Sequence, residues 1–229
     1  MSVNENLQRV RDRIEKACQR AGRNVEEIEI VAVSKTVDIS RINEAIEAGI
    51  QIIGENRVQE VWPKFQIIGP KVHWHMIGHL QTNKVKRVLQ FADMIQSVDS
   101  IHLAQEIQKQ AEKLNRSVDV LIEVNTSGEA SKFGFLPSST VQAIEKISKF
   151  SRLMIKGLMT LGAFLPNPEE VRPCFKLLRK LRDEVINNKL DTVEMKYLSM
   201  GMTDDFEVAI EEGSNMVRIG RAIFGARPG

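Results

Sequence analysis

The sequence has few cysteines, a single tyrosine and almost no net charge. Its 229 residues include two cysteines, Cys18 and Cys174, in helix-like stretches with nothing that pairs them. We therefore expect reduced thiols in a cytoplasmic protein. The 32 basic and 30 acidic residues leave a net charge of +2, so the basic field that nucleic-acid binding needs is missing and no nucleic-acid partner is expected. A local basic cluster could still hold a small anion.

Long apolar runs are also missing. The opening residues, MSVNENLQRVRDRIEKACQRAG, have no apolar core of the kind a signal sequence needs. No apolar run approaches the roughly 18 residues of a transmembrane helix. The sequence therefore predicts a protein that is neither secreted nor bound in a membrane. A hydrophobic content of 42% and a charged content of 27% are typical of a globular protein with a sizeable core, which argues against disorder.

Apolar periodicity predicts an opening helix and then alternating strands and helices. From Leu7 to Gly22, a candidate C-cap, apolar residues recur with helical spacing. Eight strand candidates follow, near residues 29–34, 50–54, 72–77, 94–98, 118–125, 153–160, 195–199 and 215–219. Helix-like stretches separate them, at 39–48, 56–65, 82–89, 100–114, 137–149, 168–186 and 203–212.

Eight strands that alternate with helices predict an α/β fold, a closed (β/α)₈ TIM barrel of parallel strands with an extra N-terminal helix. A doubly wound sheet is the alternative. No Pro-, Gly- or Ser-rich linker and no repeat divides the chain, so residues 1–229 are expected to form one domain. Only the tail RAIFGARPG follows the eighth strand. We expect a stunted final helix, with the opening helix covering part of the gap in the outer ring.

Lys35 is the first candidate for chemistry. The apolar run EIVAV ends on Ser34 and Lys35. Burial at the carboxyl end of a strand disfavours the ammonium form and frees the amine for Schiff-base chemistry. A lone lysine more often extends into solvent. However, barrels of this kind carry their chemistry at the carboxyl ends of the strands, which favours a functional Lys35.

The segments after the seventh and eighth strand candidates suit a phosphate group. The candidate residues are Ser199 and Gly201 in SMGMTDDF, and Arg218, Gly220 and Arg221 in RIGRAIFG. We expect Thr203 to cap a helix whose first turn contains Asp204 and Asp205. Free N–H groups, glycines and guanidinium groups bind anions, and barrels commonly hold phosphate in these two loops. Ordinary loop capping is the alternative. An imine-forming lysine and a phosphate cup together indicate a pyridoxal 5′-phosphate site.

A series of segments resembles the pyridoxal phosphate homeostasis protein family, which is similar to the barrel domain of alanine racemases. The segments are VAVSKT at 31–36, IGENRVQE at 53–60, WHMIGHLQTNK at 74–84, VNTSGEASKFGF at 124–135, GLMT at 157–160 and LSMGMTDDFEVAIEEGSNMVRIGRAIFG at 198–225. The resemblance implies a barrel of the alanine-racemase type, fold type III of the proteins that use this vitamin B6 cofactor. It also implies that Lys35 bears pyridoxal phosphate, and that the protein buffers or delivers it with little or no turnover.

The resemblance further implies individual contacts. Ser199, Gly201, Gly220 and residue 221 are expected at the phosphate, Arg218 at the pyridine nitrogen and Asn56 beside the ring. The family often has a small hydroxyl residue at position 221, where this chain has Arg221, so we expect its backbone N–H to meet the phosphate. A cation at the pyridine nitrogen makes the ring a weak electron sink. Expected partners are pyridoxal phosphate and apo forms of the enzymes that use it, and the chain is expected to be a monomer.

The runner-up is an active pyridoxal-dependent amino-acid racemase. Racemisation needs a second base on the opposite face of the substrate, usually a tyrosine from another domain or subunit in the related racemases. The one tyrosine, Tyr197, lies within a strand candidate and is expected in the core or barrel wall. The additional carboxyl-terminal domain of those racemases has no counterpart in the sequence. We therefore expect a catalytically quiet protein.

Two further functions remain open from the residues alone. His73, His75 and His79 have spacing that could bind zinc in a metal hydrolase, although a polar wall near the cofactor is the simpler interpretation. A general acid and base for glycoside cleavage could come from four carboxylates. These are Asp38, Glu55, Glu123 and Asp204. Most carboxylates in such positions cap helices or are solvated, so we expect neither a metal centre nor a glycosidase.

Overall fold

The computed structural model describes residues 1–190 and 192–225. Its strands form a closed barrel in chain order, and every neighbouring pair is parallel. They are β1 (Glu29–Val33), β2 (Ile52–Glu55), β3 (His73–Met76), β4 (Met94–Val98), β5 (Val118–Glu123), β6 (Leu153–Met159), β7 (Val193–Ser199) and β8 (Met216–Ile219). The predicted barrel is confirmed, and the doubly wound alternative is wrong.

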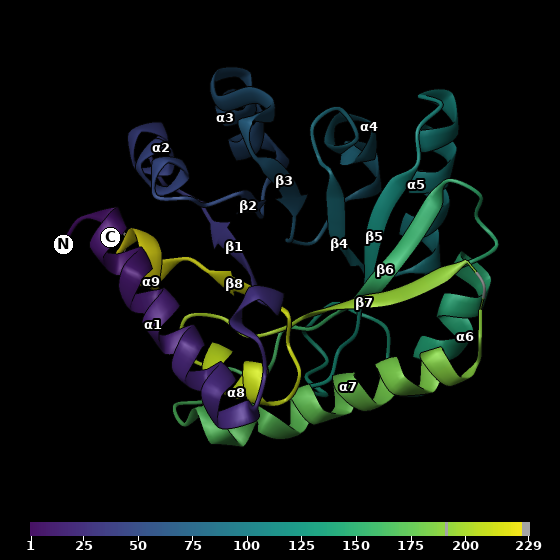
Figure 1. The fold of residues 1–229 in the computed structure, drawn as a ribbon. Helices are drawn as coiled ribbons and strands as arrows, with labels where there is room; N and C mark the ends of the chain where they lie inside the picture. The colour runs from purple at the N-terminus through teal and green to yellow at the C-terminus, as the bar shows by residue number, and fades with distance from the viewer. Residues whose placement is uncertain (191, 226–229) are drawn as a thin grey trace.

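The helices lie outside the strands, as Figure 1 shows. They are α1 (Val3–Ala21), α2 (Ile39–Glu47), α3 (Val58–Ile68), α4 (Val85–Val88), α5 (Ile101–Lys113), α6 (Pro137–Ile147), α7 (Arg172–Asn187), α8 (Phe206–Glu211) and α9 (Arg221–Phe224). Single 3₁₀ turns span Val25–Glu27, Gly69–Lys71, Thr82–Lys84 and Pro168–Val171. None of the helices in the described residues is long and apolar enough to cross a membrane.

The opening helix α1 completes the outer ring. Ser2 and Glu5 form a capping box at its start, and Gly22 ends it in the left-handed conformation with φ 65°. Its apolar face packs on α2, α8 and α9. The final helix α9 has only four residues, so α1 covers the space beside it, as the sequence predicts. Residues 226–229 of the tail lie outside the described residues.

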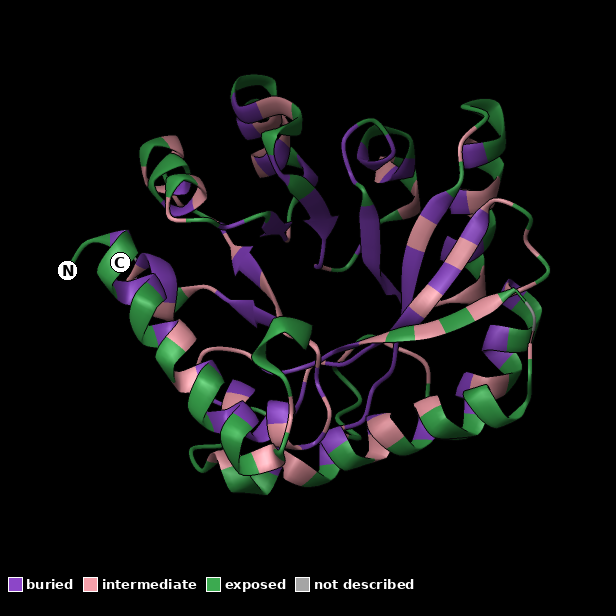
Figure 2. Cartoon of the chain, in the orientation of Figure 1, coloured by how far each residue is buried: buried purple, intermediate pink, exposed green. Residues whose placement is uncertain are grey.

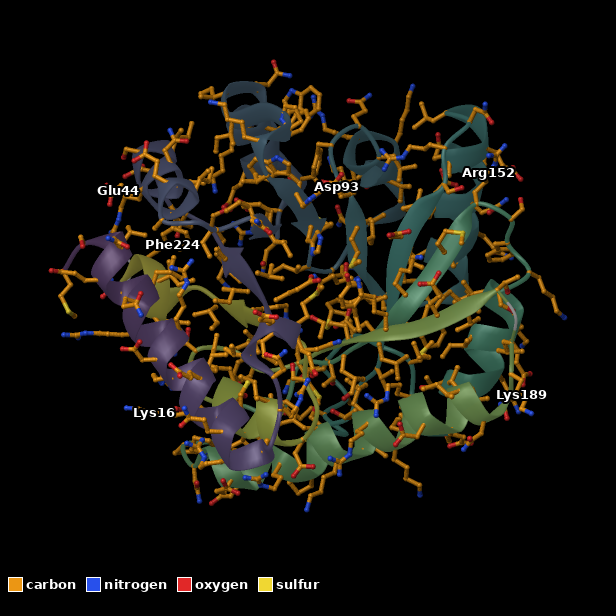
Figure 3. All side chains as sticks on the ribbon, in the orientation of Figure 1. Lys16, Glu44, Asp93, Arg152, Lys189 and Phe224 are labelled. Atoms are coloured by element: carbon orange, nitrogen blue, oxygen red, sulfur yellow. The ribbon has the colours of Figure 1, made fainter. Side chains whose placement is uncertain are left out.

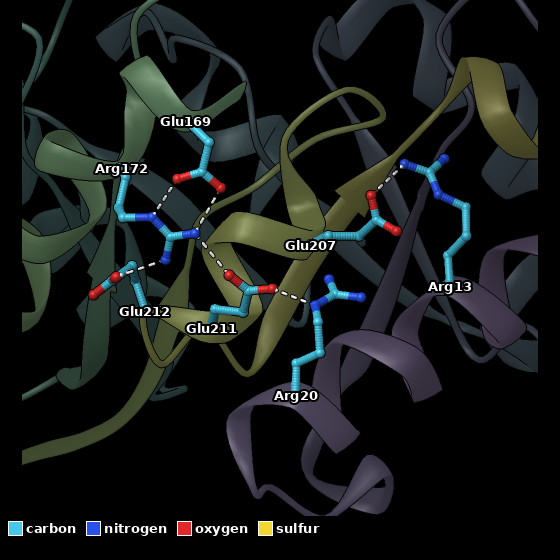
Figure 4. A network of polar contacts seen from close by, with 7 residues as sticks. All are labelled: Arg13, Arg20, Glu169, Arg172, Glu207, Glu211 and Glu212. Carbon is cyan, nitrogen blue, oxygen red and sulfur yellow. Dashed lines mark hydrogen bonds and ion pairs between the residues drawn. The ribbon is translucent and has the colours of Figure 1, made fainter. Parts of the chain in front are cut away.

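Charged residues bind α1 and the start of α7 to the short helix α8 (Figure 4). The ion pair of Arg13 with Glu207 is 3.0 Å long, and that of Arg20 with Glu211 is 2.7 Å. From the other side, Arg172 binds three carboxylates. They are Glu169 at 2.7 Å, Glu211 at 2.7 Å and Glu212 at 2.8 Å. The helix that follows β7 is therefore held by charges from two distant parts of the chain.

The expected N-cap of α8 is wrong. The helix begins at Phe206, and Asp205 occupies the cap position that the sequence assigns to Thr203. The reason is local, because Asp205 Oδ1 accepts a hydrogen bond of 2.6 Å from the backbone N–H of Met202. That bond closes a turn ahead of the helix, so Thr203 and Asp204 stay in the loop.

The apolar core lies mainly between the strands and the helices. Figure 2 shows mostly buried or half-buried strands, with exposed positions on β7, inside helices that are buried on one face. Figure 3 shows Lys16, Glu44 and Lys189 pointing outward from the ring of helices, and all three are exposed. A smaller apolar cluster fills the barrel interior. It consists of Val31, Ile52, Ile77, Met94, Leu121, Met159 and Met216. Polar side chains share this interior, and they position the site.

Candidate functional site

A cavity of about 890 Å³ opens at the carboxyl end of the barrel. Its volume is within the range of small-molecule sites. The wall is built by segments that follow almost every strand, and five of the seven residues expected to contact the cofactor line it. They are Lys35, Asn56, Arg218, Gly220 and Arg221. The barrel thus brings together side chains that are up to 186 positions apart in the sequence, counted from Lys35 to Arg221.

Lys35 lies in a turn just beyond β1 rather than on the strand. The strand ends at Val33, and Lys35 is half-buried on the cavity wall. The next residue, Thr36, has φ 60°, an uncommon value for a residue with a side chain. Its backbone N–H donates a hydrogen bond of 3.1 Å to Glu60 Oε2 of α3. The turn that presents Lys35 is therefore fixed by a neighbouring helix.

A buried ion pair lies beneath this turn. Lys64 Nζ donates hydrogen bonds of 2.6 Å to Glu55 Oε1 and to the carbonyl oxygen of Ser34. The Ser34 hydroxyl donates to the same Glu55 oxygen at 2.5 Å. Burial raises the pKa of Glu55, and the cation of Lys64 opposes that rise. The side chains of Ser34 just after β1, Glu55 of β2 and Lys64 of α3 thus connect the end of β1 to its neighbours.

Arg218 lies inside the barrel on β8. It is 3% exposed, and it donates hydrogen bonds of 2.6 Å to Ser199 Oγ and 2.7 Å to the carbonyl oxygen of Thr160. The Ser199 hydroxyl donates in turn to Gln96 Oε1 at 2.6 Å, and the Gln96 amide donates to His75 Nδ1 at 2.8 Å. This chain of hydrogen bonds crosses the barrel interior from β3 to β8 and fixes the Arg218 guanidinium.

Arg218 stays cationic at neutral pH. Burial lowers its pKa to about 10, and the nearby carboxylates of Asp205 and Glu123 oppose the change. The group therefore provides a fixed positive charge in a region with little water, where electrostatic interactions are strong.

Ser199 and Gly201 are not on the cavity wall. Ser199 is fully buried, and its hydroxyl proton is directed to Gln96. Gly201 has φ 92°, and a Cβ there would lie 2.6 Å from Ala209 Cβ and 2.8 Å from Phe206 Cα. A side chain at this position would therefore displace the start of α8. Their expected contacts with a phosphate stay predictions.

Gly220 and Arg221 line the wall where β8 ends. A Cβ on Gly220 would lie 3.3 Å from the carbonyl oxygen of Val33, so glycine allows β8 to pass close to the end of β1. The Arg221 side chain is exposed and forms an ion pair with Asp204, which belongs to the β7 loop. The guanidinium thus has a partner on the rim. The expected contact of the Arg221 backbone N–H with a phosphate stays a prediction.

Asn56 follows β2 and contributes an unpaired acceptor. Its side-chain oxygen Oδ1 is buried, and no group in residues 1–190 or 192–225 forms a hydrogen bond with it. A buried acceptor without a partner costs about 1–3 kcal/mol. Because Asn56 also lines the cavity, this oxygen is a candidate contact for a donor group of a ligand.

Glu123 is a site residue that the sequence suggests for other chemistry. It ends β5, lines the cavity and is 4% exposed. Burial, with a further contribution from Asp99, raises the pKa of Glu123 to about 7. Asp99 Oδ2 lies 2.7 Å from His79 Nδ1, and the His79 ring stacks on Phe133 at the cavity rim. Glu123 ends the apolar run VDVLIE, and that position is the signal in the sequence that could have linked Glu123 to the cavity.

Tyr197 lies at the other end of the barrel. Its hydroxyl donates a hydrogen bond of 3.1 Å to Glu29 Oε1. Glu29 is the first residue of β1, whereas Lys35 follows the last. The lone tyrosine is therefore remote from the cavity mouth.

The remaining histidines and carboxylates are dispersed. His73 is exposed on β3, His75 binds Gln96 and His79 binds Asp99. Within the described ranges, no group of three or more His, Cys, Asp or Glu side chains is placed to hold a metal ion. Of the four carboxylates considered for glycoside cleavage, Glu55 is paired with Lys64. Glu123 and Asp204 are the two that line the cavity.

A closed parallel barrel with a lysine just after β1 and a buried arginine on β8 defines a barrel of the alanine-racemase type. Residues 6–228 match the family model "Alanine racemase, N-terminal domain". The chain is 46% identical over 228 residues to the pyridoxal phosphate homeostasis protein of Aquifex aeolicus, covering 99% of each chain. The chain belongs to the pyridoxal phosphate homeostasis protein family.

Solved structures agree with the barrel. PipY of Synechococcus elongatus PCC7942, solved with PLP bound, superimposes with a TM-score of 0.84 at 28% identity, covering 98% of this chain and 100% of PipY. An alanine racemase of Clostridium difficile 630 gives a TM-score of 0.76 at 17% identity, covering 100% of this chain and 56% of the racemase. The second likeness concerns the fold alone.

Proposed function

We propose that this chain binds pyridoxal phosphate as a Schiff base on Lys35 and serves as a carrier or reservoir of it, with little or no turnover. The observation that carries the proposal is the convergence of Lys35, Asn56 and Arg218 on one cavity. The family membership and the cofactor named in the PipY structure support it. The bound cofactor supplies an aldehyde that condenses with amines.

The residues present fit the cofactor. Arg218 offers a cation for the pyridine nitrogen, and Asn56 has an unused acceptor on the wall among the described residues. The phosphate is assigned to the loops after β7 and β8. Its proposed contacts are Ser199, Gly201, Gly220 and the backbone N–H of Arg221. We also propose a cytoplasmic monomer that supplies apo enzymes dependent on pyridoxal phosphate.

Borohydride trapping tests the covalent assignment. Reduction of the loaded protein, followed by peptide mass mapping, should place a pyridoxyl-phosphate adduct on the peptide that contains Lys35. The variant Lys35→Arg keeps the charge but forms no imine, so it should lose the adduct. The matched control Lys113→Arg alters an exposed lysine on α5 and should keep it. An adduct found only on other lysines would contradict the proposal.

A further inference from the structure

We propose that a second cavity, on the outer face where α1, α2 and α9 meet, binds a small anion with two or more phosphate groups. The cavity has a volume of about 560 Å³, within the range of small-molecule sites. Arginines line it, whereas no aspartate or glutamate of the described residues does. They are Arg9, Arg13, Arg41 and Arg221. The site goes beyond the proposed function, which uses only the backbone N–H of Arg221.

Three helices bring these arginines together. The short helix α9 lies beside α1 (Figure 1), and Asn6 of α1 donates a buried hydrogen bond of 3.0 Å to a carbonyl oxygen of α9. Arg9 and Arg13 are four positions apart on α1, so they share one face of that helix. Arg41 comes from α2, and its Nη2 atom would lie 4.0 Å from a Cβ on Gly225, the residue that ends α9. The packing of the helices therefore holds the guanidinium groups around one space.

The positive charge of this cavity is only partly compensated. Arg13 and Arg221 pair with carboxylates that are not part of the cavity lining. Arg9 and Arg41 belong to no ion pair within the part of the chain that the structure describes. Arginine keeps its charge at physiological pH, and like charges four positions apart on a helix repel each other. An anion in the cavity would relieve that repulsion.

The number of guanidinium groups indicates the class of anion. A guanidinium group binds phosphate oxygens in pairs through its planar fork of N–H groups. A phosphate monoester has only three terminal oxygens, fewer than four bidentate pairs would use. A chain of two or three phosphate groups supplies more oxygens and more negative charge. The cavity therefore fits the phosphate chain of an inorganic polyphosphate or of a nucleotide.

Calorimetry with inorganic triphosphate and with orthophosphate, in buffer free of divalent metals, tests the site. Because Arg221 also lines the cavity at the carboxyl end of the barrel, pyridoxal phosphate is first reduced onto the protein with borohydride, which fills that cavity. The wild type should bind triphosphate at least about tenfold more tightly than orthophosphate. Arg9→Gln and Arg41→Gln should each weaken triphosphate binding about ten- to a hundredfold. The control Arg182→Gln alters α7 outside the cavity lining and should bind as the wild type does.

Thermal unfolding provides a readout that also checks folding. Without an anion, Arg9→Gln and Arg41→Gln should unfold at or above the temperature of the wild type, because each removes one of several like charges. Triphosphate should raise the unfolding temperature of the wild type and of Arg182→Gln. The double variant Arg9→Gln, Arg41→Gln should gain much less from the same addition.

Adenosine triphosphate then distinguishes the two sources of the phosphate chain. Tighter binding than that of inorganic triphosphate indicates a nucleotide, and equal binding indicates the phosphate chain alone. Equal triphosphate affinities of the wild type and both single variants, or no preference for triphosphate over orthophosphate, would overturn the proposal. So would a short single-stranded RNA that binds more tightly than triphosphate, because the partner would then be a nucleic acid. A protein that takes up no pyridoxal phosphate would refute the proposed function alone, and the same variants titrated as purified would still decide this site.

Discussion

At the residue scale, the geometry of Lys35 depends on charges that never reach the cavity. Glu55 is fully buried, and one of its two oxygens, Oε2, has no hydrogen-bond partner among the described residues. Its other oxygen takes both available donors, Lys64 and Ser34. A buried pair of this kind contributes little net stability, but removal of one partner strands the other charge. The pair is thus a sensitive point under the turn that presents Lys35.

We expect Lys64→Met to lower the free energy of unfolding by about 3–5 kcal/mol at neutral pH. Without the cation, the pKa of folded Glu55 rises further above its unfolded value. The folded variant then retains a proton that the unfolded chain releases, so its stability falls as pH increases between those two values. Urea unfolding should therefore show a larger deficit at about pH 8 than at about pH 5.

The double variant Glu55→Gln, Lys64→Met should recover part of the loss, because the stranded charge is gone. The control Lys146→Met, an exposed lysine on α6, should change the free energy of unfolding by less than about 0.5 kcal/mol. A deficit that is the same at both pH values would show that the loss comes from packing and not from the charge of Glu55.

Some residues of the candidate site can be predicted from the sequence, and others cannot. Lys35 and Arg218 follow from their places at strand ends, because a barrel gathers such residues at one mouth. The hydrogen bond of the Ser199 hydroxyl does not follow from its place in the sequence. Its partner, Gln96, lies on another strand, 103 positions away. Nor does the sequence predict that Asn56 Oδ1 has no hydrogen-bond partner among the described residues. Strand patterning gives the position of a side chain and the face on which it lies, but not its rotamer or its partners.

At the scale of elements, the loop before the helix α8 forms part of the cavity wall, and α8 holds the end of that loop. The loop residues Met202 to Asp205 line the cavity, and α8 is only six residues long. A helix this short gains little stability of its own, so it relies on its packing and on the ion pairs with α1 and Arg172. Apolar periodicity predicts that the helix exists. It cannot predict the late start, which depends on the bond from Met202 to Asp205.

We expect Arg172→Met to destabilise the protein by about 1–3 kcal/mol, because Glu212 is nearly buried and would lose one of its cations. Hydrogen bonds to three carboxylates raise the pKa of Arg172, so the loss should be largest where those carboxylates are ionised and should shrink in acid. Thermal unfolding measures the effect. Arg182→Met, which disrupts only a pair with the adjacent Asp183 on α7, should cost less than about 0.5 kcal/mol. Equal losses in the two variants would refute the special role of Arg172.

At the scale of the whole molecule, the barrel separates two groups that a racemase would need together. Tyr197 bonds to Glu29 at the amino end, while Lys35 lies at the carboxyl end. Glu123, at the end of β5, also lines the cavity, and burial raises its pKa to about 7. With the cofactor bound as proposed, Arg218, which keeps its charge, would weaken the ring as an electron sink.

We therefore expect the loaded protein to exchange the α-hydrogen of L-alanine with deuterated water slowly, while it passes pyridoxal phosphate to an apo enzyme. The cavity is open to an amine that could displace Lys35 from the Schiff base, and such exchange needs no carbanion. Mass spectrometry of recovered alanine and activation of the apo enzyme measure the two processes side by side. Activation faster than spontaneous release indicates direct transfer, and activation limited by release supports a reservoir. Rapid exchange with inversion, lost in Glu123→Gln but kept in the control Lys113→Arg, would instead identify Glu123 as the opposing base and make the protein a racemase.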